Sequence, residues 1–273
     1  MRLQASSVVL TGATGGMGQA IVDALCAAGA RVLVVGRQLG MLDEIQQRHP
    51  GQVESLHADL RRAEDRAGIV AAARRLTGFN VLINAAGVNH FGLFESMDDA
   101  GIADLIDTNL TATLQLTRSL LPLLKAAPQG CVVNIGSTLG SIGYPGFSTY
   151  CASKFALRGF SEALRRELAD TRVGVLYLAP RATRTEMNSA RVEAMNRVLQ
   201  VAMDSPELVA VELVRALDRD LREVHLGWPE RLLVRLNGLL PRLLDGALRR
   251  RLPTIQRFAR PTHKTPVQSE QKS

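Results

Sequence analysis

Short apolar runs rich in β-branched residues alternate with stretches of helical spacing through most of this 273-residue chain. We expect strands over residues 8–10, 31–35, 53–58, 81–83, 131–136 and 172–178. Repeated strand–helix units build a parallel sheet whose two faces are covered by helices. The alternation therefore predicts one doubly wound α/β domain, and the length suits one such domain better than two.

Helical spacing is clearest in three of the intervening stretches. Residues 63–76 and 150–168 each predict one helix, and residues 98–126 predict a long helix with Asn109 near its middle. Pro122 lies inside that long helix. It predicts a kink or an early end, because proline lacks the N–H that helix hydrogen bonds need.

A glycine-rich turn follows the first strand and precedes a helical pattern. Glycines let the backbone approach a pyrophosphate, which then lies at the positive N-terminus of the helix. The turn therefore predicts a dinucleotide site at the carboxyl ends of the strands, with an ordinary tight loop as the alternative. The expected contacts are Gly12, Thr14, Gly15, Gly16, Met17 and Gly18.

The end of the second strand predicts which dinucleotide is bound. In NAD-binding proteins, an acidic residue about 20 residues past the glycines holds the ribose hydroxyls. Gly36 and Arg37 occupy that place in this chain, so no carboxylate is present there. A guanidinium suits a phosphate. Arg37 therefore predicts NADP(H), with a solvated loop arginine as the alternative.

A hydroxyl, a phenol and an amine are spaced for acid–base chemistry between Ser137 and Lys154. Tyr150 and Lys154 are four residues apart and share a helix face, and the glycine-rich segment after Ser137 can fold back to it. A tyrosine normally titrates near pH ~10. A neighbouring cation lowers that pKa toward the value that proton transfer needs. Tyr150 is therefore the expected proton donor; an amphipathic helix without chemistry is the alternative.

Together these residues resemble the compact, single-domain branch of the short-chain dehydrogenase/reductase family, over about residues 5–226. The family's T-G-x-x-x-G-x-G pattern begins at Thr11, its N-(N/A)-A-G segment follows the fourth strand, and its tetrad matches Asn109, Ser137, Tyr150 and Lys154. The resemblance implies a Rossmann-type fold and makes Tyr150 the general acid/base. It also implies that Lys154 binds the nicotinamide ribose, that Ser137 orients the carbonyl, and that Asn109 supports a water-linked proton relay.

The resemblance implies further cofactor contacts beyond the glycine turn. These are Asp59, Leu60, Asn84, Ala85, Ala86, Gly87, Tyr150, Lys154, Pro180, Thr183 and Thr185. The first two would flank the adenine, and Thr185 stands where the family has a nicotinamide-contacting threonine. The sequence departs from the family after Pro180, where Arg181 replaces the usual glycine, and at Thr183, where an apolar residue is usual.

Residues 186–204 lie where the family carries a mobile substrate lid. Their soft apolar face is formed by Met187, Met195, Val198, Leu199 and Met203. Such a face suits a lipophilic substrate. Packing of the same face on the protein's own core is an open alternative.

The composition changes at Leu226. Residues 226–273 hold ten Lys and Arg against three carboxylates, so the chain's whole net charge of +7 lies there. Pro229 and Pro241 each suit the first position of a helix, and each helix would carry leucines on one face. Basic amphipathic helices are typical of membrane surfaces. Residues 229–251 therefore predict contact with an anionic bilayer, with packing against another subunit as the alternative.

We therefore divide the chain into an NADP-binding catalytic domain (1–226), a basic amphipathic helical extension (227–261) and a tail (262–273) that we expect to be disordered. The three cysteines are odd in number and widely spaced, which suits a reducing compartment. Cysteines and histidines show no metal-ligand spacing, and no apolar run is long enough to cross a bilayer.

These observations predict a cytoplasmic protein, peripheral at the inner face of a membrane, that forms a homodimer or homotetramer and binds neither metal nor nucleic acid. The expected activity is NADP(H)-dependent interconversion of a ketone or aldehyde and an alcohol, on a lipophilic substrate. The alternative is a non-catalytic NADP-sensing or scaffold protein at a membrane surface. The intact tetrad argues against that alternative, because a sensor needs no paired Tyr150 and Lys154.

Overall fold

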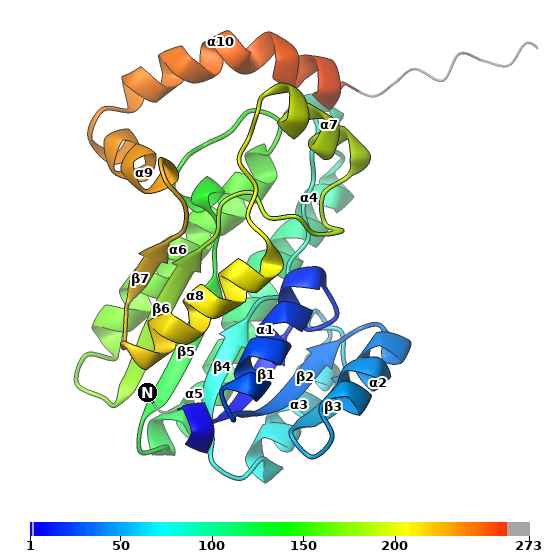
Figure 1. Cartoon of the computed structure of the whole chain (residues 1–273), viewed down its shortest axis with the longest axis vertical. Coiled ribbons are helices and arrows are strands. Elements are labelled where there is room, and N and C mark those ends of the chain that lie inside the picture. The colour runs from blue at the N-terminus through cyan, green and yellow to red at the C-terminus, as the bar shows by residue number, and fades with distance from the viewer. Residues whose placement is uncertain (2, 261–273) are drawn as a thin grey trace, which may run out of the picture.

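The computed structural model describes Met1 and residues 3–260. Its centre is a sheet of seven strands in the order β3-β2-β1-β4-β5-β6-β7, and every neighbouring pair is parallel (Figure 1). The strands are β1 (Ser7–Thr11), β2 (Arg31–Gly36), β3 (Val53–His57), β4 (Phe79–Asn84), β5 (Gly130–Ile135), β6 (Val173–Ala179) and β7 (Glu223–His225). The strand order reverses between β1 and β4, so the predicted doubly wound α/β fold is confirmed.

Helices cover both faces of the sheet. They are α1 (Gly16–Ala27), α2 (Leu39–Arg48), α3 (Ala63–Arg75), α4 (Asp99–Ile106), α5 (Ala112–Ala126), α6 (Ser148–Glu167), α7 (Ala190–Val198), α8 (Pro206–Asp218), α9 (Glu230–Leu239) and α10 (Pro241–Ala259). Successive strand side chains point to opposite faces. In β1, Val8 and Leu10 therefore pack with α1, α2 and α8, whereas Val9 packs with α3, α5 and α6.

The long helix expected over residues 98–126 is interrupted at a different place from the one predicted. A π-helical turn, Asp107–Thr111, separates α4 from α5. Pro122 neither ends nor shortens α5, which continues to Ala126, so the predicted early end is wrong. Pro122 is exposed, so water can solvate the carbonyl that its missing N–H leaves free.

The last two described helices gather with α7 at one end of the molecule (Figure 1). Helix α10 begins at Pro241 as predicted, whereas Pro229 is the cap of α9 rather than its first residue. None of the described helices combines the length and apolar character that crossing a membrane needs. The expectation of a disordered tail over residues 262–273 lies outside the described residues.

Candidate active site

The glycine turn between β1 and α1 is pressed against the segment that follows β4. Gly12 has a φ of 71°, and a Cβ on it would lie 2.6 Å from the amide nitrogen of Ala86. A Cβ on Gly18 would lie 2.1 Å from the Gly12 oxygen. The Thr11 hydroxyl accepts hydrogen bonds from the Ala85 and Ala86 amides at 3.2 and 3.3 Å. Only glycine fits at positions 12 and 18, so these contacts fix the backbone conformation of the turn.

The turn fits the pyrophosphate that the sequence predicts there. Helix α1 begins at Gly16 with Gly15 as its cap, and no side chain caps its first amides. Those N–H groups are the donors that anions take at helix N-termini. A Cβ on Gly15 would meet only the Gly12 oxygen, at 3.7 Å, and one on Gly16 would lie 3.7 Å from Thr185. The predicted nicotinamide-contacting threonine thus lies beside the glycine turn.

Charged side chains meet at the ends of β2 and β3. Arg37 is exposed directly after β2, and Asp59 lies two residues past β3. Hydrogen bonds from Arg61 are the main cause that lowers the pKa of Asp59 to about 2, and the nearby charge of Arg37 contributes to that value. Leu60 is buried in the core beside them. Arg61 forms ion pairs with Asp59 and Asp104, whereas Arg37 has no ion pair among the described residues, and adenine contacts by Asp59 and Leu60 stay predictions.

The Asn84 side chain is bonded inside the protein. Its amide nitrogen donates to Thr117 at 3.0 Å and to Asn134 at 2.9 Å, and Asn134 donates in turn to Ser161 at 2.8 Å. This buried network joins β4, β5, α5 and α6. Asn84 therefore holds residues 84–87, the segment at the end of β4, in place. Its own contact with a cofactor stays a prediction.

The three residues expected to carry the chemistry lie together. Ser137 has extended backbone at the end of β5, and its hydroxyl is hydrogen-bonded to Tyr150. The Lys154 ammonium donates to the Ile135 carbonyl at 2.9 Å and lies 5.8 Å from the centre of the Tyr150 ring. The i, i+4 spacing on α6 and the turn back from β5 thus bring hydroxyl, phenol and amine to one place.

Burial dominates the proton affinities of this site. It raises the pKa of Tyr150 to about 12, against the lowering effect of the Ser137 hydrogen bond. It also lowers the pKa of Lys154 to about 8. The net shift of the Tyr150 pKa is therefore upward, opposite to the lowering that the sequence analysis expects from Lys154, because desolvation is the larger effect. Tyr150 is therefore a neutral proton donor at pH 7.

Asn109 lies in the π-helical turn, a feature common at functional sites. Its amide nitrogen donates to the Val88 carbonyl at 2.9 Å and to Ser153 at 3.1 Å, and its oxygen accepts from the Val88 amide at 2.8 Å. A Cβ on Gly87 would lie 3.3 Å from that oxygen and 3.7 Å from the Lys154 nitrogen. Asn109 therefore holds the 84–88 segment beside Lys154, and its water-linked relay stays a prediction.

The segment after β6 closes the site. The Pro180 carbonyl accepts from the Thr138 amide at 2.8 Å, which ties this segment to the loop after β5. Thr183 is buried, and its hydroxyl donates to the Arg181 carbonyl at 3.0 Å. These bonds give Pro180 and Thr183 fixed positions, while their contacts with a cofactor stay predictions.

Tyr177 supports the site, although the sequence analysis did not identify it. Its hydroxyl lies 3.4 Å from both the amide nitrogen and the carbonyl oxygen of Ser137. A Cβ on Gly136 or Gly140 would lie within 2.4 Å of the Tyr177 ring or hydroxyl. The two glycines around Ser137 are the sequence signal that could have indicated a buried ring beneath that loop.

An apolar cluster from α6, α7, α10 and the loops after β4 and β5 packs with the Tyr150 ring. Its members are Phe91, Leu139, Tyr144, Phe147, Tyr150, Cys151, Val192, Met195, Leu199, Ile255 and Phe258. The Arg191 guanidinium fastens α7 to the end of α10 by donating to the Phe258 and Ala259 carbonyls, at 2.9 and 2.7 Å. Met195 is buried in this cluster, whereas Met187 is exposed. The lid segment and α10 therefore form one apolar roof.

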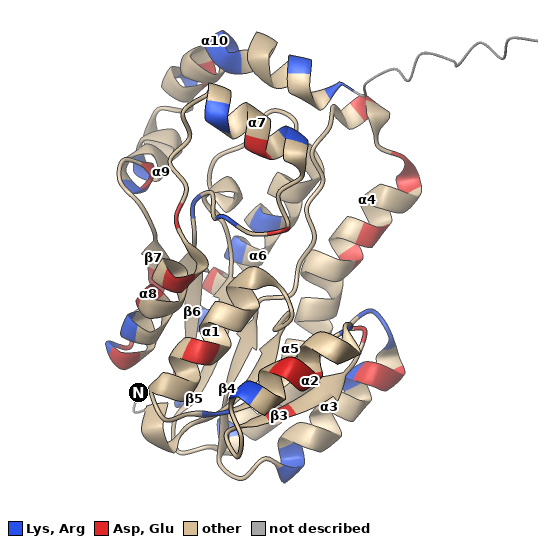
Figure 2. Ribbon diagram, turned by 45° about the vertical axis from the view of Figure 1, so that its right-hand side comes forward, with Lys and Arg blue, Asp and Glu red and all other residues tan. Residues whose placement is uncertain are grey.

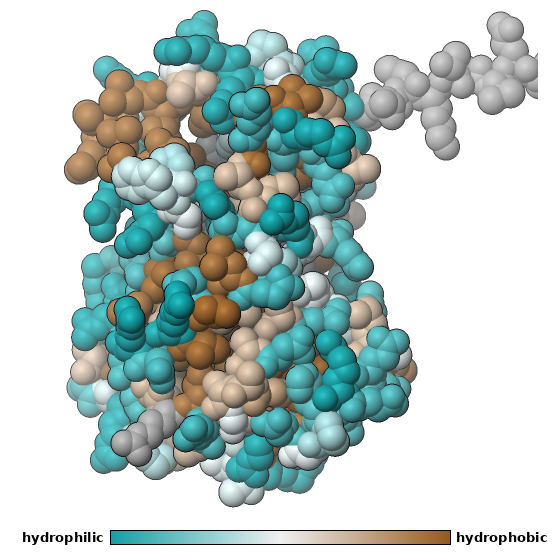
Figure 3. All heavy atoms as spheres, in the orientation of Figure 1, coloured by the Kyte–Doolittle hydropathy of each residue, from teal (hydrophilic) through white to brown (hydrophobic). Residues whose placement is uncertain are grey.

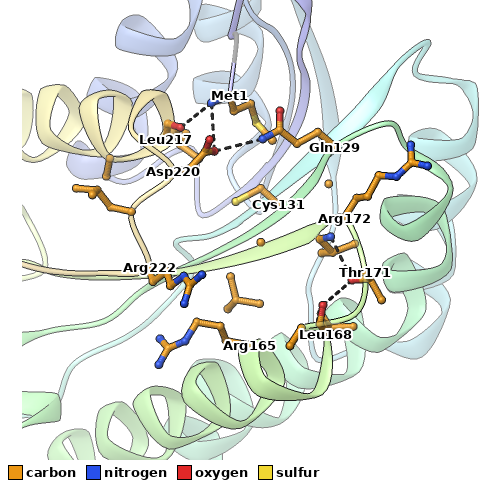
Figure 4. Close-up of a pocket in the computed structure, with 17 residues that line it drawn as sticks. Met1, Gln129, Cys131, Arg165, Leu168, Thr171, Arg172, Leu217, Asp220 and Arg222 are labelled. Carbon is orange, nitrogen blue, oxygen red and sulfur yellow. Dashed lines mark hydrogen bonds and ion pairs between the residues drawn. The ribbon is translucent and has the colours of Figure 1, made fainter.

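A separate cavity of about 340 Å³ lies at the opposite edge of the sheet (Figure 4). It is lined by residues at the amino ends of β5 and β6, and Cys131 points toward its middle. Burial raises the pKa of that thiol to about 12, so it is an unreactive thiol. The groups that carry chemistry lie at the carboxyl ends instead, as expected for this topology.

Comparison with known sequences identifies relatives along most of the chain. The family model for short chain dehydrogenase matches residues 6–196. Nodulation protein G of Rhizobium sp. (strain N33) is 32% identical over 217 residues, which cover 79% of this chain and 89% of that protein. The 3-oxoacyl-acyl-carrier-protein reductase of Vibrio harveyi is 28% identical over 229 residues, which cover 78% of this chain and 90% of that protein.

Solved structures share the architecture. A short chain dehydrogenase from Burkholderia cenocepacia J2315, in complex with NADP, has a TM-score of 0.78 at 25% identity and covers 91% of this chain and 99% of its own. A short chain dehydrogenase/reductase from Burkholderia phymatum, in complex with NAD, has a TM-score of 0.80 at 20% identity. The match covers 89% of this chain and 96% of that structure's chain. The fold is therefore one on which nicotinamide dinucleotides bind.

Proposed function

Because the chain belongs to the short-chain dehydrogenase/reductase family, we propose that it uses NADP(H) to interconvert a lipophilic ketone or aldehyde and the corresponding alcohol. Oxidoreduction at a CH–OH group is the reaction of the family. The observation that carries the proposal is the convergence of Ser137, Tyr150 and Lys154 beneath an apolar roof. A non-catalytic sensor would not need a half-buried, protonated phenol at this place.

The arrangement suggests how the chain's own residues act in reduction. Bound NADP(H) supplies or accepts the hydride. The hydroxyls of Ser137 and Tyr150 lie close enough to each other to bond one carbonyl oxygen. Tyr150 is protonated and donates its proton to that oxygen as negative charge develops on it. Lys154, buried beside the ring, stabilises the phenolate that remains, and its pKa of about 8 keeps most of it charged at pH 7.

The preference for NADP(H) is supported by the arginine at the end of β2. Arg37 is exposed there, and neither Gly36 nor Gln38 beside it supplies the carboxylate that a ribose would use. A charge-assisted hydrogen bond is worth about 1.5–3 kcal/mol. Arg37→Ala should therefore weaken NADPH binding and leave NADH binding nearly unchanged, as measured by calorimetry. The matched control is Arg62→Ala, an exposed arginine that caps α3, and equal loss for both cofactors contradicts the assignment.

The lipophilic substrate is supported by the composition of the roof over Tyr150. Aromatic, aliphatic and sulfur-containing side chains from three helices and two loops pack with the ring, and apolar surroundings of this kind suit apolar ligands. The relative from Vibrio harveyi is named for a 3-oxoacyl substrate, a ketone on an acyl chain. The test is NADPH oxidation with ketones and 3-oxoacyl thioesters of graded chain length. kcat/KM should rise with chain length, and a preference for the shortest ketones contradicts the proposal.

Membrane contact is supported by the corner between α9 and α10. Leu239, Leu240 and Leu243 are all more than half exposed there. Figure 3 shows an apolar patch over the α9 and α10 end of the molecule, at its upper left. Basic side chains lie on the same two helices (Figure 2). Each basic residue near an anionic bilayer adds about 1 kcal/mol of binding. We call Leu239, Leu240 and Leu243 the outer apolar patch and propose that this patch binds an anionic membrane surface.

Liposome sedimentation tests that assignment. Full-length protein should pellet with anionic liposomes at low salt and less at high salt. Replacing Leu239, Leu240 and Leu243 by serine should abolish pelleting, whereas the matched change of Leu208 and Val211, exposed on α8, should not. If both variants pellet like the parent, the outer patch serves another purpose, and a homodimer or homotetramer that buries it is the competing account. Size-exclusion chromatography of the triple variant identifies that case by a change in assembly.

A further inference from the structure

Arg181 stands where the family usually has glycine, and its side chain bonds two separate segments. Its Nε and Nη2 donate to Oδ1 of Asp204 at 2.9 and 2.6 Å. Its Nη1 donates to Glu230 at 3.3 Å and to the Trp228 carbonyl at 3.4 Å. The side chain of Arg181 is only 18% exposed. It therefore joins the end of β6, the end of the lid segment and the start of α9.

Asp204 is the lid-side partner, and its carboxylate forms an ion pair with Arg181. Its side chain is 4% exposed, and its Oδ2 is buried with no hydrogen-bond partner among the described residues. Its backbone pairs with the segment after β6, because its amide donates to Ala182 at 2.9 Å and its carbonyl accepts from Arg184 at 3.0 Å. A buried carboxylate needs a partner of opposite charge. Arg181 thus holds the strand-like contact between residues 182–184 and Asp204.

The backbone around Arg181 is shaped to admit its side chain. Gly227, before α9, has a φ of 88°, and a Cβ on it would lie 2.6 Å from Cδ of Arg181 and 2.8 Å from the Glu230 carboxylate. Only glycine takes that backbone conformation readily and leaves that space. Arg181 replaces the glycine that is usual in the family, and the glycine at position 227 leaves the space that the Arg181 side chain occupies.

The segment that Arg181 holds leads directly to the cofactor turn. Thr185 lies one residue past Arg184 and next to Gly16, at 3.7 Å from a Cβ placed there. Helix α9 also reaches the other side of the site, where the Asn237 amide donates to the Ser141 carbonyl at 2.9 Å. The position of α9 is thus linked to the lid, to Thr185 and to the loop after Ser137.

We propose that Arg181 is a positioning residue through which helix α9 fixes the lid segment and Thr185 against the cofactor turn. The proposal rests on the proposed function, because it assigns Thr185 a cofactor to contact. Helix α9 of the C-terminal extension then helps to position the cofactor site of the catalytic domain. Movement of α9 changes cofactor affinity through Arg181, with no contact between α9 and the cofactor.

The mildest test removes one link and leaves the others. Glu230→Gln removes the α9 carboxylate and leaves Arg181 paired with Asp204, so folding should be retained. We expect hydrogen exchange to rise together in residues 182–185 and 230–237, and the NADPH dissociation constant to rise about three- to tenfold, while kcat changes less. The control, Glu212→Gln, breaks an exposed ion pair with Arg215 on α8 and should change neither quantity.

A stronger change tests the charge itself. Arg181→Met leaves the Asp204 carboxylate buried and unpaired, so it should loosen residues 182–204 more than Glu230→Gln does. Adding Asp204→Asn should restore part of the protection, since it removes that charge. Arg181→Lys should leave residues 182–204 less protected from hydrogen exchange than in the parent. One ammonium cannot bond both the Asp204 and the Glu230 carboxylates as the planar guanidinium does.

The outcomes separate this proposal from the proposed function. If Glu230→Gln loosens α9 while residues 182–185 stay protected and NADPH affinity is unchanged, Arg181 does not transmit the position of α9 and the proposal fails. If the exchange of the two segments rises together but the parent protein binds no NADPH, the positioning role stands and the proposed function fails. If Arg181→Met does not fold, the Glu230→Gln result alone decides.

Discussion

The loop after β5 and the hairpin of α9 and α10 (residues 230–259) both carry patterns that the sequence makes visible, but the two patterns differ in what they determine. In the loop, the spacing of Ser137, Tyr150 and Lys154 determines their contacts, because one turn and one helix connect them. In the hairpin, the leucine pattern leaves the partner open. Leu244 packs against the loop, whereas Leu239 is 80% exposed. Local spacing therefore predicts a site, and amphipathic spacing predicts only that some partner exists.

The largest effect should come from the phenol of Tyr150, which lies on α6 beside the loop. Tyr150→Phe should lower kcat by about 10²–10⁴-fold, because the proposed proton donor to the carbonyl oxygen is lost. NADPH affinity should stay close to that of the parent, measured by calorimetry. Tyr144→Phe is the matched control, since Tyr144 lies in the loop before α6 and its hydroxyl interacts with Arg251 of α10 rather than with Ser137. Near-parent kcat in Tyr150→Phe would show that proton donation lies elsewhere.

Two leucines of the hairpin should separate its inner and outer faces. Leu244→Ala removes a buried side chain that packs with Ile142 and Val234, and such changes cost about 2–5 kcal/mol of unfolding free energy. Leu239→Ala changes an exposed residue and should stay within about 0.5 kcal/mol of the parent. Urea unfolding measures both. Equal costs for the two variants would mean that the faces are not divided as described.

Support beneath the loop should have a smaller effect. Tyr177→Phe keeps the ring but removes the hydroxyl that contacts the Ser137 backbone. A hydrogen bond contributes about 0.5–1.5 kcal/mol, so kcat should fall about two- to tenfold while NADPH affinity holds. Steady-state kinetics with a verified ketone checks this. A fall as large as that of Tyr150→Phe would give Tyr177 a direct part in the chemistry.

A separate prediction concerns pH and stability. Burial lowers the pKa of Lys154 from 10.5 to about 8, so the unfolded chain binds more protons than the folded one between these values. The contribution of Lys154 to unfolding free energy should therefore rise with pH in that window, by at most about 1.4 kcal/mol per pH unit. The measurement is the difference between the parent and Lys154→Met at pH 7.5 and 9.5. The buried cysteine thiols, whose pKa values are also raised, are the same in both proteins, so their contribution cancels in the difference. A difference in unfolding free energy that is equal at the two pH values contradicts the burial of a titrating amine.

Much of the fold could be predicted because each strand and helix carries its own period. The tetrad could be predicted because its spacing reflects one turn and one helix. The partners of Arg181 could not, since Asp204 and Glu230 are 23 and 49 residues away and only the folded chain brings them together. The pKa of Tyr150 depends on burial by α7 and α10, which no local pattern contains. The division of the hairpin's leucines depends on tertiary packing in the same way.

The central claim is that hydride passes between NADP(H) and a carbonyl carbon whose oxygen is protonated by Tyr150. The most direct measurement uses NADPH deuterated at C4, on each face in turn, with the preferred ketone and mass spectrometry of the product. We predict that one of the two labelled cofactors transfers deuterium to the carbinol carbon, and that Tyr150→Phe binds the same cofactor but transfers almost none. Deuterium transfer by Tyr150→Phe at the parent rate, or alcohol formed without label from either cofactor, would contradict the account.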